Sequence, residues 1–532
     1  INELMAQNAS TNPDDSRESW EVFDETGEST DWIELYNVSD IPISMNGWYL
    51  TDNPDNLTQW AFPSHVILQP KSYLLIYASG KGIVSGNYIH TNFSLSEAGE
   101  YLALVAPGGK IVSEYRDVNG GYPPQETNIS YGLFGYFTEH RYFYPATPNR
   151  PNKNSAIGIA PDTKFSVKRG FFTAPFDVAI TTDDPAATIR YTLDGSTPTL
   201  ENGFVYNPDT PIHISKTTTL RATAFKTGWL PGNVDTQTYI FIGDVITQSP
   251  NGELPGPGWP ASRAVNSHIM DYGMDPDIIN HAVYSSLMDE ALLAIPTLSL
   301  VTDLKYLFDP VQGVYVNTGE TTRSDGDSFE RPCSLELINP DGSDGFQIDC
   351  GMRIRGGASR NANNPKHALR FFFRSQYGAG KLKYPLFGEE GTDEFDKMDL
   401  RTAANYGWSA CWLSASINVQ NTFVRDEYSR LVQGLLGHPY TRGRYYHLYI
   451  NGQYWGLYQT EERPDARFAA SYLGGVKDDY DVVKPDITVG RTVAATDGNM
   501  DAYRRLYDAV IDGIGSITEY YALQGMNPDG TR

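Results

Sequence analysis

Cysteine is rare in this chain, with three residues in 532, so a disulfide-rich scaffold is excluded. Long apolar runs are also missing. The longest, residues 291–301, is interrupted by Pro296 and polar residues, and it falls far short of the roughly 20 residues that cross a bilayer. Basic residues number 41 against 65 acidic ones, a formal net charge of -24. We therefore expect no membrane span, and no nucleic-acid partner because an acidic surface repels a phosphate backbone.

Aromatic residues, glycine and proline are abundant, with 35 tyrosines, 49 glycines and 33 prolines. This composition is typical of β-rich extracellular modules with many turns. At about 150 residues per domain, the length predicts three or four domains. Ile1 directly precedes an expected strand, so we expect a mature or trimmed chain that has lost its export signal. The expected location is therefore secreted, extracellular or at the cell surface.

Residues 1–150 alternate apolar and polar positions in short runs such as DWIELYNVS, GWYLTD and SYLLIYAS. Gly, Pro, Asn and Asp separate these runs, and the spacing predicts a β-sandwich. The segments INELMAQN, DETGESTDWIELYN and GWYLTDNPDNLTQWAFP resemble the lamin-tail domain of bacterial secreted proteins. That resemblance implies an immunoglobulin-like fold.

Four acidic residues crowd ahead of the first strong strand of this module: Asp24, Glu25, Glu28 and Asp31. Carboxylate oxygens are the ligands that Ca²⁺ prefers, so these side chains are candidate calcium ligands. Their spacing is not that of an EF-hand. A solvated acidic loop is the alternative interpretation.

A proline-rich linker, ATPNRPNKNS, leads into a second β module at residues 160–243. Its segments YTLDGSTPT and TTTLRATAFKTGWLPG resemble the small fibronectin-like module at the C-terminus of chitobiases and hexosaminidases. The resemblance implies an immunoglobulin-like sandwich. Because the module is an accessory in those enzymes, its presence gives no reason to expect a hydrolase. Residues 244–295 are rich in Pro and Gly, and we expect this connector to pack against the next domain in an ordered form.

The third domain, residues 296–532, combines expected strands and helices, which predicts an α+β fold with one mostly antiparallel sheet. The segment CSLELINPDGSDGFQIDC predicts a hairpin that places Cys333 opposite Cys350, as a cross-strand disulfide requires. Two reduced core thiols are the alternative. Cys411 is then an unpaired, buried thiol. The dipeptide Asn451-Gly452 predicts a second hairpin.

Two helices are expected in this domain, each with one apolar stripe turned toward the core. The first begins near Asn421 and ends at Gly437, and its expected buried residues are Val424, Tyr428, Leu431 and Leu435. The second covers residues 501–511, and its expected buried residues are Tyr503, Leu506, Tyr507 and Val510.

The stretch GMRIRGGASRNANNPKHALRFFF, residues 351–373, predicts two strands joined by a glycine turn and a polar loop. Gly356 and Gly357 allow a close backbone approach, and several hydroxyl and cationic donors surround them: Arg355, Ser359, Arg360, Lys366 and Arg370. Such a layout suits a phosphate group. The alternative is an ordinary hairpin whose arginines lie over aromatic rings or pair with acidic residues.

Several segments follow one another in the order found in the CotH family: IRGGASR, LRTAANYGW, FVRDEYSR, YINGQYWGLYQTEERPD and DYDVVK. This family contains spore-coat and secreted proteins with an atypical protein-kinase fold, and the resemblance spans residues 296–490. It implies an extracellular kinase that uses ATP and magnesium to phosphorylate protein serines. It places the glycine loop and Lys366 at the nucleotide phosphates, Glu462 as the carboxylate that orients the lysine, and Arg370 and Lys484 in the cleft.

The family's catalytic aspartate and its metal-binding Trp-Asp-x-Asp segment are not found in this chain, whose last residue is Arg532. Two interpretations stay open. In one, the chain is the front of a longer kinase whose activity requires residues beyond Arg532. In the other, it is a non-catalytic structural or adhesion protein that self-assembles into a surface layer or filament. Carbohydrate binding through exposed Trp and Tyr is a third interpretation. Across the three interpretations, the expected partner is a protein substrate or a surface or matrix component.

Overall fold

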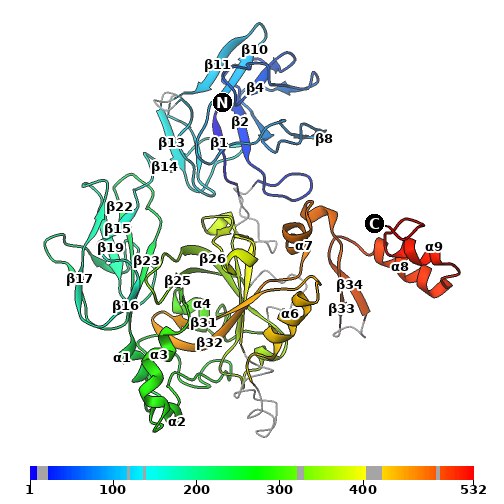
Figure 1. The fold of residues 1–532 in the computed structure, drawn as a ribbon. Helices are drawn as coiled ribbons and strands as arrows, with labels where there is room; N and C mark the ends of the chain where they lie inside the picture. The colour runs from blue at the N-terminus through cyan, green and yellow to red at the C-terminus, as the bar shows by residue number, and fades with distance from the viewer. Residues whose placement is uncertain are drawn as a thin grey trace. The chain divides into compact units, whose positions relative to one another are not determined.

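The computed structural model describes residues 1–8, 22–116, 120–135, 139–319, 329–402, 422–486 and 492–531. Figure 1 shows strands through most of the chain, and helices from α1 in the middle of the chain to α9 near its end. By internal contacts the chain forms two units. The first consists of Ile1–Lys383, Phe395–Thr422 and Tyr445–Gln459. The second consists of Tyr384–Glu394, Phe423–Arg444 and Thr460–Arg532.

The first module is a sandwich of two antiparallel sheets, as predicted. Their strand orders are β14-β13-β12-β1-β2-β7 and β11-β10-β4-β5. The strands are β1 (Glu3–Met5), β2 (Trp32–Tyr36), β4 (Tyr49–Thr51), β5 (Trp60–Ala61), β7 (Tyr73–Tyr77), β10 (Leu102–Ala106), β11 (Lys110–Tyr115), β12 (Ser130–Phe134), β13 (Glu139–Phe143) and β14 (Ser155–Ala156). Two small strand pairs complete it: β3 (Ile43–Ser44) with β6 (Ile67–Leu68), and the hairpin of β8 (Val84–Ser85) with β9 (Tyr88–Ile89). Alternate residues of the strands, Leu4, Ile33 and Leu102 among them, form the core.

Two carboxylates are buried in the six-stranded sheet of this module. Glu3 on β1 lies opposite Glu34 on β2, and neither side chain is exposed to solvent. Glu3 accepts hydrogen bonds from the backbone and hydroxyl of Thr147, at 2.9 and 2.7 Å. Glu34 accepts one from the side-chain amide of Asn2 at 2.7 Å. Burial raises the pKa of Glu34 to about 8, and the nearby Glu3 adds to the rise.

The second module is β-rich, as predicted. Its main sheet has the order β16-β23-β22-β19-β20, and two strand pairs, β15–β18 and β17–β21, complete it. The strands are β15 (Thr163–Phe165), β16 (Gly170–Phe172), β17 (Phe176–Val178), β18 (Ile180–Thr182), β19 (Thr188–Thr192), β20 (Phe204–Val205), β21 (Ile212–Ile214), β22 (Thr218–Phe225) and β23 (Asp235–Phe241). Val178, Ile180, Leu220 and Tyr239 form the centre of its core.

The sheet of the third domain closes into a barrel of order β24-β25-β26-β27-β30-β32-β31. The strands are β24 (Thr297–Val301), β25 (Arg331–Ile338), β26 (Gln347–Arg355), β27 (Ala368–Phe372), β30 (Lys397–Arg401), β31 (Gly443–Ile450) and β32 (Gln453–Glu461). The pairings of β24 through β30 are antiparallel, while β24 and β31 pair in parallel and close the ring. Among these strand pairs, the predicted mostly antiparallel sheet is confirmed. The kinase-like arrangement stays a prediction.

Both predicted hairpins of the barrel are present. Cys333 and Cys350 are direct partners in the β25–β26 ladder, so the predicted register is confirmed. They are buried thiols whose Sγ atoms lie 3.5 Å apart, and their disulfide stays a prediction. Asn451 and Gly452 join β31 to β32 with φ angles of 45° and 80°, which is the twist that suits a two-residue hairpin. Cys411 lies outside the described residues.

Buried polar contacts tie the second module to the barrel. Glu336 on β25 is fully buried and accepts hydrogen bonds from the backbone N–H of Thr238, at 3.1 Å, and from its hydroxyl. Arg169 Nε lies 3.3 Å from the same carboxylate. Asp303 accepts a second pair of bonds, from the backbone and hydroxyl of Thr197 at 3.1 and 2.8 Å. Each carboxylate on the barrel side is therefore satisfied by donors of the second module.

The connector between these modules is ordered and packs on the barrel, as predicted. It contains α1 (Ile242–Ile246), α2 (Pro276–Ile279), η1 (Tyr284–Leu287) and α3 (Met288–Leu293). Its Trp259 and Tyr272 are buried, with ring centroids 6.2 and 5.9 Å from that of Trp455 on β32. The connector therefore shares the aromatic core at this end of the barrel.

The remaining elements lie around and after the barrel strands. They are α4 (Leu304–Phe308), η3 (Ala358–Arg360), η4 (Ser375–Tyr377), β28 (Leu382–Lys383), η5 (Gly388–Glu390), β29 (Glu394–Phe395), α6 (Arg425–Leu435), α7 (Ala466–Leu473), η6 (Lys477–Asp479), β33 (Val482–Asp486), β34 (Thr492–Asp497), α8 (Asp501–Asp512) and α9 (Ile517–Leu523). No helix among the described residues combines the length and the apolar character that a bilayer crossing requires.

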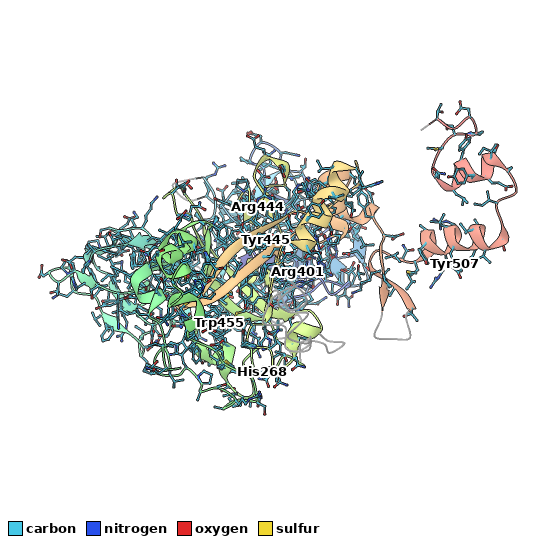
Figure 2. The ribbon with its side chains drawn as sticks, turned by 60° about the horizontal axis from the view of Figure 1, so that its bottom comes forward. His268, Arg401, Arg444, Tyr445, Trp455 and Tyr507 are labelled. Carbon is cyan, nitrogen blue, oxygen red and sulfur yellow. The ribbon has the colours of Figure 1, made fainter. Side chains whose placement is uncertain are left out.

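The predicted burial of the two apolar helix stripes is wrong in the described structure. Both helices form where expected, at α6 and α8. However, Tyr428 and Leu435 of α6 are 67% and 78% exposed, and Tyr507 of α8, labelled in Figure 2, is 54% exposed. Periodicity shows which face of a helix is apolar, but it does not show what covers that face.

We expect the first module to lose stability as the pH rises. Glu34 has an ordinary pKa of 4.5 and a folded-state pKa of about 8, so its contribution is fully present below pH 4.5 and is lost as the pH rises through 8. The loss should be roughly 2–5 kcal/mol. Thermal proteolysis at pH 6 and pH 9, read by mass spectrometry, compares peptides of residues 1–150 with those of the other modules. Glu34→Gln cannot ionise and should shrink the difference between the two pH values, and an unchanged difference would contradict this account.

Candidate anion-binding site

The predicted glycine turn joins the ends of β26 and β27 at one end of the barrel. Gly356 has a φ of 86°, and a Cβ atom placed on it would lie 2.7 Å from the Ser359 hydroxyl. Only glycine fits that position without strain. A Cβ on Gly357 would meet nothing within 4 Å, so the surface beside this residue is open.

Two arginines at this turn share one buried carboxylate. Arg355 Nε and Arg370 Nη2 lie 3.0 and 2.9 Å from the same oxygen of Asp399, and Arg370 Nε donates to the other oxygen. Asp399 is 4% exposed. Burial lowers the pKa of Arg360, and the nearby guanidinium groups of Arg370 and Arg355 lower it further. Among the described residues, three guanidinium groups therefore gather around the carboxylate of Asp399.

Arg360 is the least satisfied member of this arginine cluster of Arg355, Arg360 and Arg370. Its Nη2 donates to the carbonyl of Ile354 at 3.3 Å. Its Nε and Nη1 are buried and have no hydrogen-bond partner within the part of the chain that the structure describes. Buried donors are nearly always paired, so these two atoms mark a place for an acceptor that the described residues do not supply. An anion would satisfy them, because its oxygens accept hydrogen bonds and its charge is opposite to that of the guanidinium group.

The alternative interpretation of this hairpin holds for its other arginines. Arg353 pairs with Glu330 at 2.6 Å and lies over the ring of Phe372, 4.4 Å from its centroid. Arg374 pairs with the same carboxylate at 3.2 Å and lies 4.9 Å from the same ring. Pairing with acids and rings therefore accounts for these side chains. It does not account for Arg360.

Two predicted phosphate donors make other contacts. Ser359 is 6% exposed, and its hydroxyl donates to the carbonyl of Arg355 at 2.8 Å. Lys366 Nζ donates to the carbonyl of Asp271 in the connector at 2.7 Å, and it lies 4.2 Å from the ring centroid of Trp455, which Figure 2 shows on the β31–β32 hairpin. Burial lowers the pKa of Lys366 to about 8. The phosphate-binding roles of both residues stay predictions.

A pair of buried histidines, which sequence reasoning missed, holds the loop after the glycine turn. His367 Nδ1 faces the carbonyl of Ser359 and therefore donates to it, so its Nε2 accepts from His268 Nδ1 at 3.1 Å. Burial lowers the pKa of both imidazoles, that of His367 to about 4. They stay neutral at physiological pH and link the connector, where Figure 2 labels His268, to the loop. No local motif in the sequence marks this pairing, because 99 positions separate the two residues.

The other predicted cleft residues lie in the second unit. Glu462 is 6% exposed and accepts hydrogen bonds from the backbone and Nη1 of Arg442, at 2.8 and 3.1 Å, and from the hydroxyl of Tyr472. Lys484 on β33 is exposed. Their roles in orienting a lysine and lining a nucleotide cleft stay predictions.

The acidic residues of the first module, predicted as calcium ligands, are divided among several partners. Lys81 Nζ lies 2.6 Å from Asp24 and 3.1 Å from Glu28, and it supplies a positive charge to both. Lys81 and bonds from Thr26 and the Glu28 backbone hold the pKa of Asp24 well below its usual range, despite the opposing effect of burial.

The two remaining acidic residues of this set contact other partners. Glu25 lies 2.9 Å from Nε2 of the buried His90, and Asp31 accepts a backbone hydrogen bond from Asn8 at 3.1 Å. Within the described residues, Asp24, Glu25 and His90 form the one group of three potential metal ligands that lie close together. The calcium site stays a prediction.

Three family models match separate parts of the chain. They are Lamin Tail Domain at residues 1–118, Fn3 associated at residues 178–239 and CotH kinase protein at residues 352–509. The chain combines these three domains. The domain composition predicted from the sequence is thereby confirmed, and the CotH match includes the glycine turn and the arginine cluster. A search among curated proteins gives no match.

We expect Asp399→Asn to destabilise the CotH domain by roughly 2–4 kcal/mol at low salt, because it removes the carboxylate that Arg355 and Arg370 share. Phosphate or sulfate should restore part of the loss by binding the folded state. Urea unfolding with and without phosphate measures both effects. Glu139→Gln, which removes an exposed partner of Arg141, is the control and should respond weakly to phosphate. If phosphate does not raise the stability of the Asp399→Asn variant against urea, the anion site is contradicted.

Proposed function

We propose that the arginine cluster of the CotH domain binds the phosphate groups of a nucleotide, in a kinase-like protein of the cell surface or extracellular space. One observation carries this proposal: the Nε and Nη1 atoms of Arg360 are buried without a partner in the described structure, beside the open surface at Gly357. Phosphate oxygens are strong acceptors for guanidinium groups, and partial burial strengthens the attraction.

The resemblance to the CotH family supports ATP as the nucleotide and a protein serine as the phosphate acceptor. Phosphoryl transfer depends chiefly on positioning and on neutralising the charge of the transferred group. The arginine cluster can supply that neutralisation. For magnesium, the described residues of the CotH domain gather no group of three acidic or histidine ligands, so the donor set is not complete among them. Magnesium therefore enters this proposal from the family resemblance alone.

A structural or adhesive role is the second candidate, and the state of Lys366 favours it. Its amine is held by the carbonyl of Asp271 and the ring of Trp455, both in the first unit, so a nucleotide phosphate would have to displace these contacts. In that role the CotH domain would bind an anion without transferring it, and the two β modules would supply surfaces for assembly at the cell surface.

We expect Mg-ATP to raise the melting temperature of the chain, and Arg360→Gln to weaken ATP binding at least tenfold. The matched control is Arg374→Gln. Arg374 pairs with Glu330, the carboxylate that it shares with Arg353, so this substitution should leave ATP binding within about twofold. Isothermal titration measures the affinities. Transfer of labelled γ-phosphate to a serine-rich protein then separates the two candidates, since binding without transfer supports the structural role. Absence of ATP binding by the unmodified chain would contradict the nucleotide proposal.

An extracellular location predicts that Cys333 and Cys350 are joined in the native protein. The thiols are already register partners 3.5 Å apart, so a small movement would allow the bond. Non-reducing digestion of protein from its native host, after alkylation, should yield one linked peptide pair. Reduction should lower stability by about 3 kcal/mol, and it should not affect a Cys333→Ser, Cys350→Ser variant. Full alkylation of both thiols before reduction would contradict export to an oxidising compartment.

A further inference from the structure

A cleft of about 1050 Å³ lies within the first unit, away from the arginine cluster. The Fn3-associated domain forms one wall with residues from 192–218, and the connector forms the other with residues from 244–259. The Asn451-Gly452 turn of the barrel contributes to the floor. Small-molecule sites usually measure about 300–1000 Å³, so this cleft is large enough for a short peptide segment.

The charged groups in this cleft are mainly acidic. Asp194, Asp244 and Glu253 line it, and their hydrogen-bond donors are neutral; Asp244, for example, accepts from the backbone N–H of Thr217 at 2.7 Å. No basic side chain of the described residues forms an ion pair with any of the three. Lys216 is the one lysine in the lining, and the lining contains no arginine. The cleft therefore has a net negative charge and attracts a cationic ligand.

Apolar side chains are exposed in the same cleft. Phe204 is 61% exposed, Leu254 is 47% exposed and Leu193 is 38% exposed. Exposed large apolar residues on a concave surface are characteristic of binding sites. The ligand should therefore present apolar groups as well as positive charge.

The edge of a sheet lies at this cleft. Phe204 belongs to β20, the outer strand of the five-stranded sheet, whose neighbour on the inner side is β19. β20 has two residues: Phe204 pairs with Tyr191 of β19, and the backbone N–H and C=O of Val205, next to the cleft, face outward and can pair with one more strand. Peptide recognition by strand addition uses such an edge, with main-chain bonds for affinity and side-chain contacts for specificity.

We propose that this cleft binds an extended segment of a partner protein in which lysine or arginine alternates with apolar residues. The segment adds a strand beside β20. Its apolar side chains contact Phe204 and Leu254, and its basic side chains approach Asp194 and Asp244. Successive side chains of a strand point to opposite sides, so an alternating sequence can meet both kinds of surface at once.

The probe is a fluorescein-labelled peptide of four Lys-Val repeats, and fluorescence anisotropy with the full chain measures its affinity. A peptide of four Glu-Val repeats should not bind. A third peptide, with the same residues arranged as a lysine block and a valine block, has the same charge but lacks the alternation, and it should bind at least fivefold more weakly than the alternating peptide. Equal binding of the alternating and block peptides would overturn strand addition.

Substitutions in the cleft test its location. The double variant Asp194→Asn, Asp244→Asn should weaken binding at least fivefold, and Phe204→Ser should weaken it at least threefold with no change in charge. The matched control is Asp183→Asn with Asp209→Asn, which removes the same charge from the same domain outside the cleft lining and should leave affinity unchanged. Equal weakening of peptide binding by the two double variants would overturn the proposal. Displacement of the bound peptide by a neutral oligosaccharide would also overturn it.

Discussion

The outer face of the β26–β27 hairpin depends on a carboxylate that belongs to neither of its strands. In the ladder, Arg353 lies directly opposite Arg370, and Arg370 lies directly opposite Asp399 of β30. Two like charges opposite one another repel, so a hairpin with these residues requires acidic neighbours. Asp399 supplies one, and Glu330 supplies the other. The third strand therefore determines where the arginines point, and with them the cationic surface at the glycine turn.

The connector packs with the barrel as one structural body, although the CotH match begins only at residue 352. It reaches the loop after the glycine turn through His268, through the backbone of Ile269 bonded to Ala362, and through the carbonyl of Asp271. The loop that follows the arginine cluster is thus held by a segment nearly 100 positions earlier.

Local sequence features predicted the local structure well. Asn451-Gly452 and the Cys333–Cys350 segment form the expected hairpins, because turn type and strand register are set by neighbouring residues. Closure of the sheet could not be predicted, since it depends on β24 pairing with β31 about 150 positions away. The same limit applies to the site. The sequence pattern identified the arginines and glycines. It could not show that Asp399, on a distant strand, pairs with Arg355 and Arg370 and leaves Arg360 without a described partner for two of its donors. Amphipathic periodicity likewise located α6 and α8 but overestimated their burial.

The Glu336 contacts have a consequence for how these modules are inherited. This carboxylate is buried, and its donors, Thr238 and Arg169, both belong to the second module, residues 160–243. A gene rearrangement that exchanged this domain for an unrelated one would leave an acid in the barrel wall without donors, which is strongly unfavourable. We therefore expect the Fn3-associated and CotH domains to be inherited together.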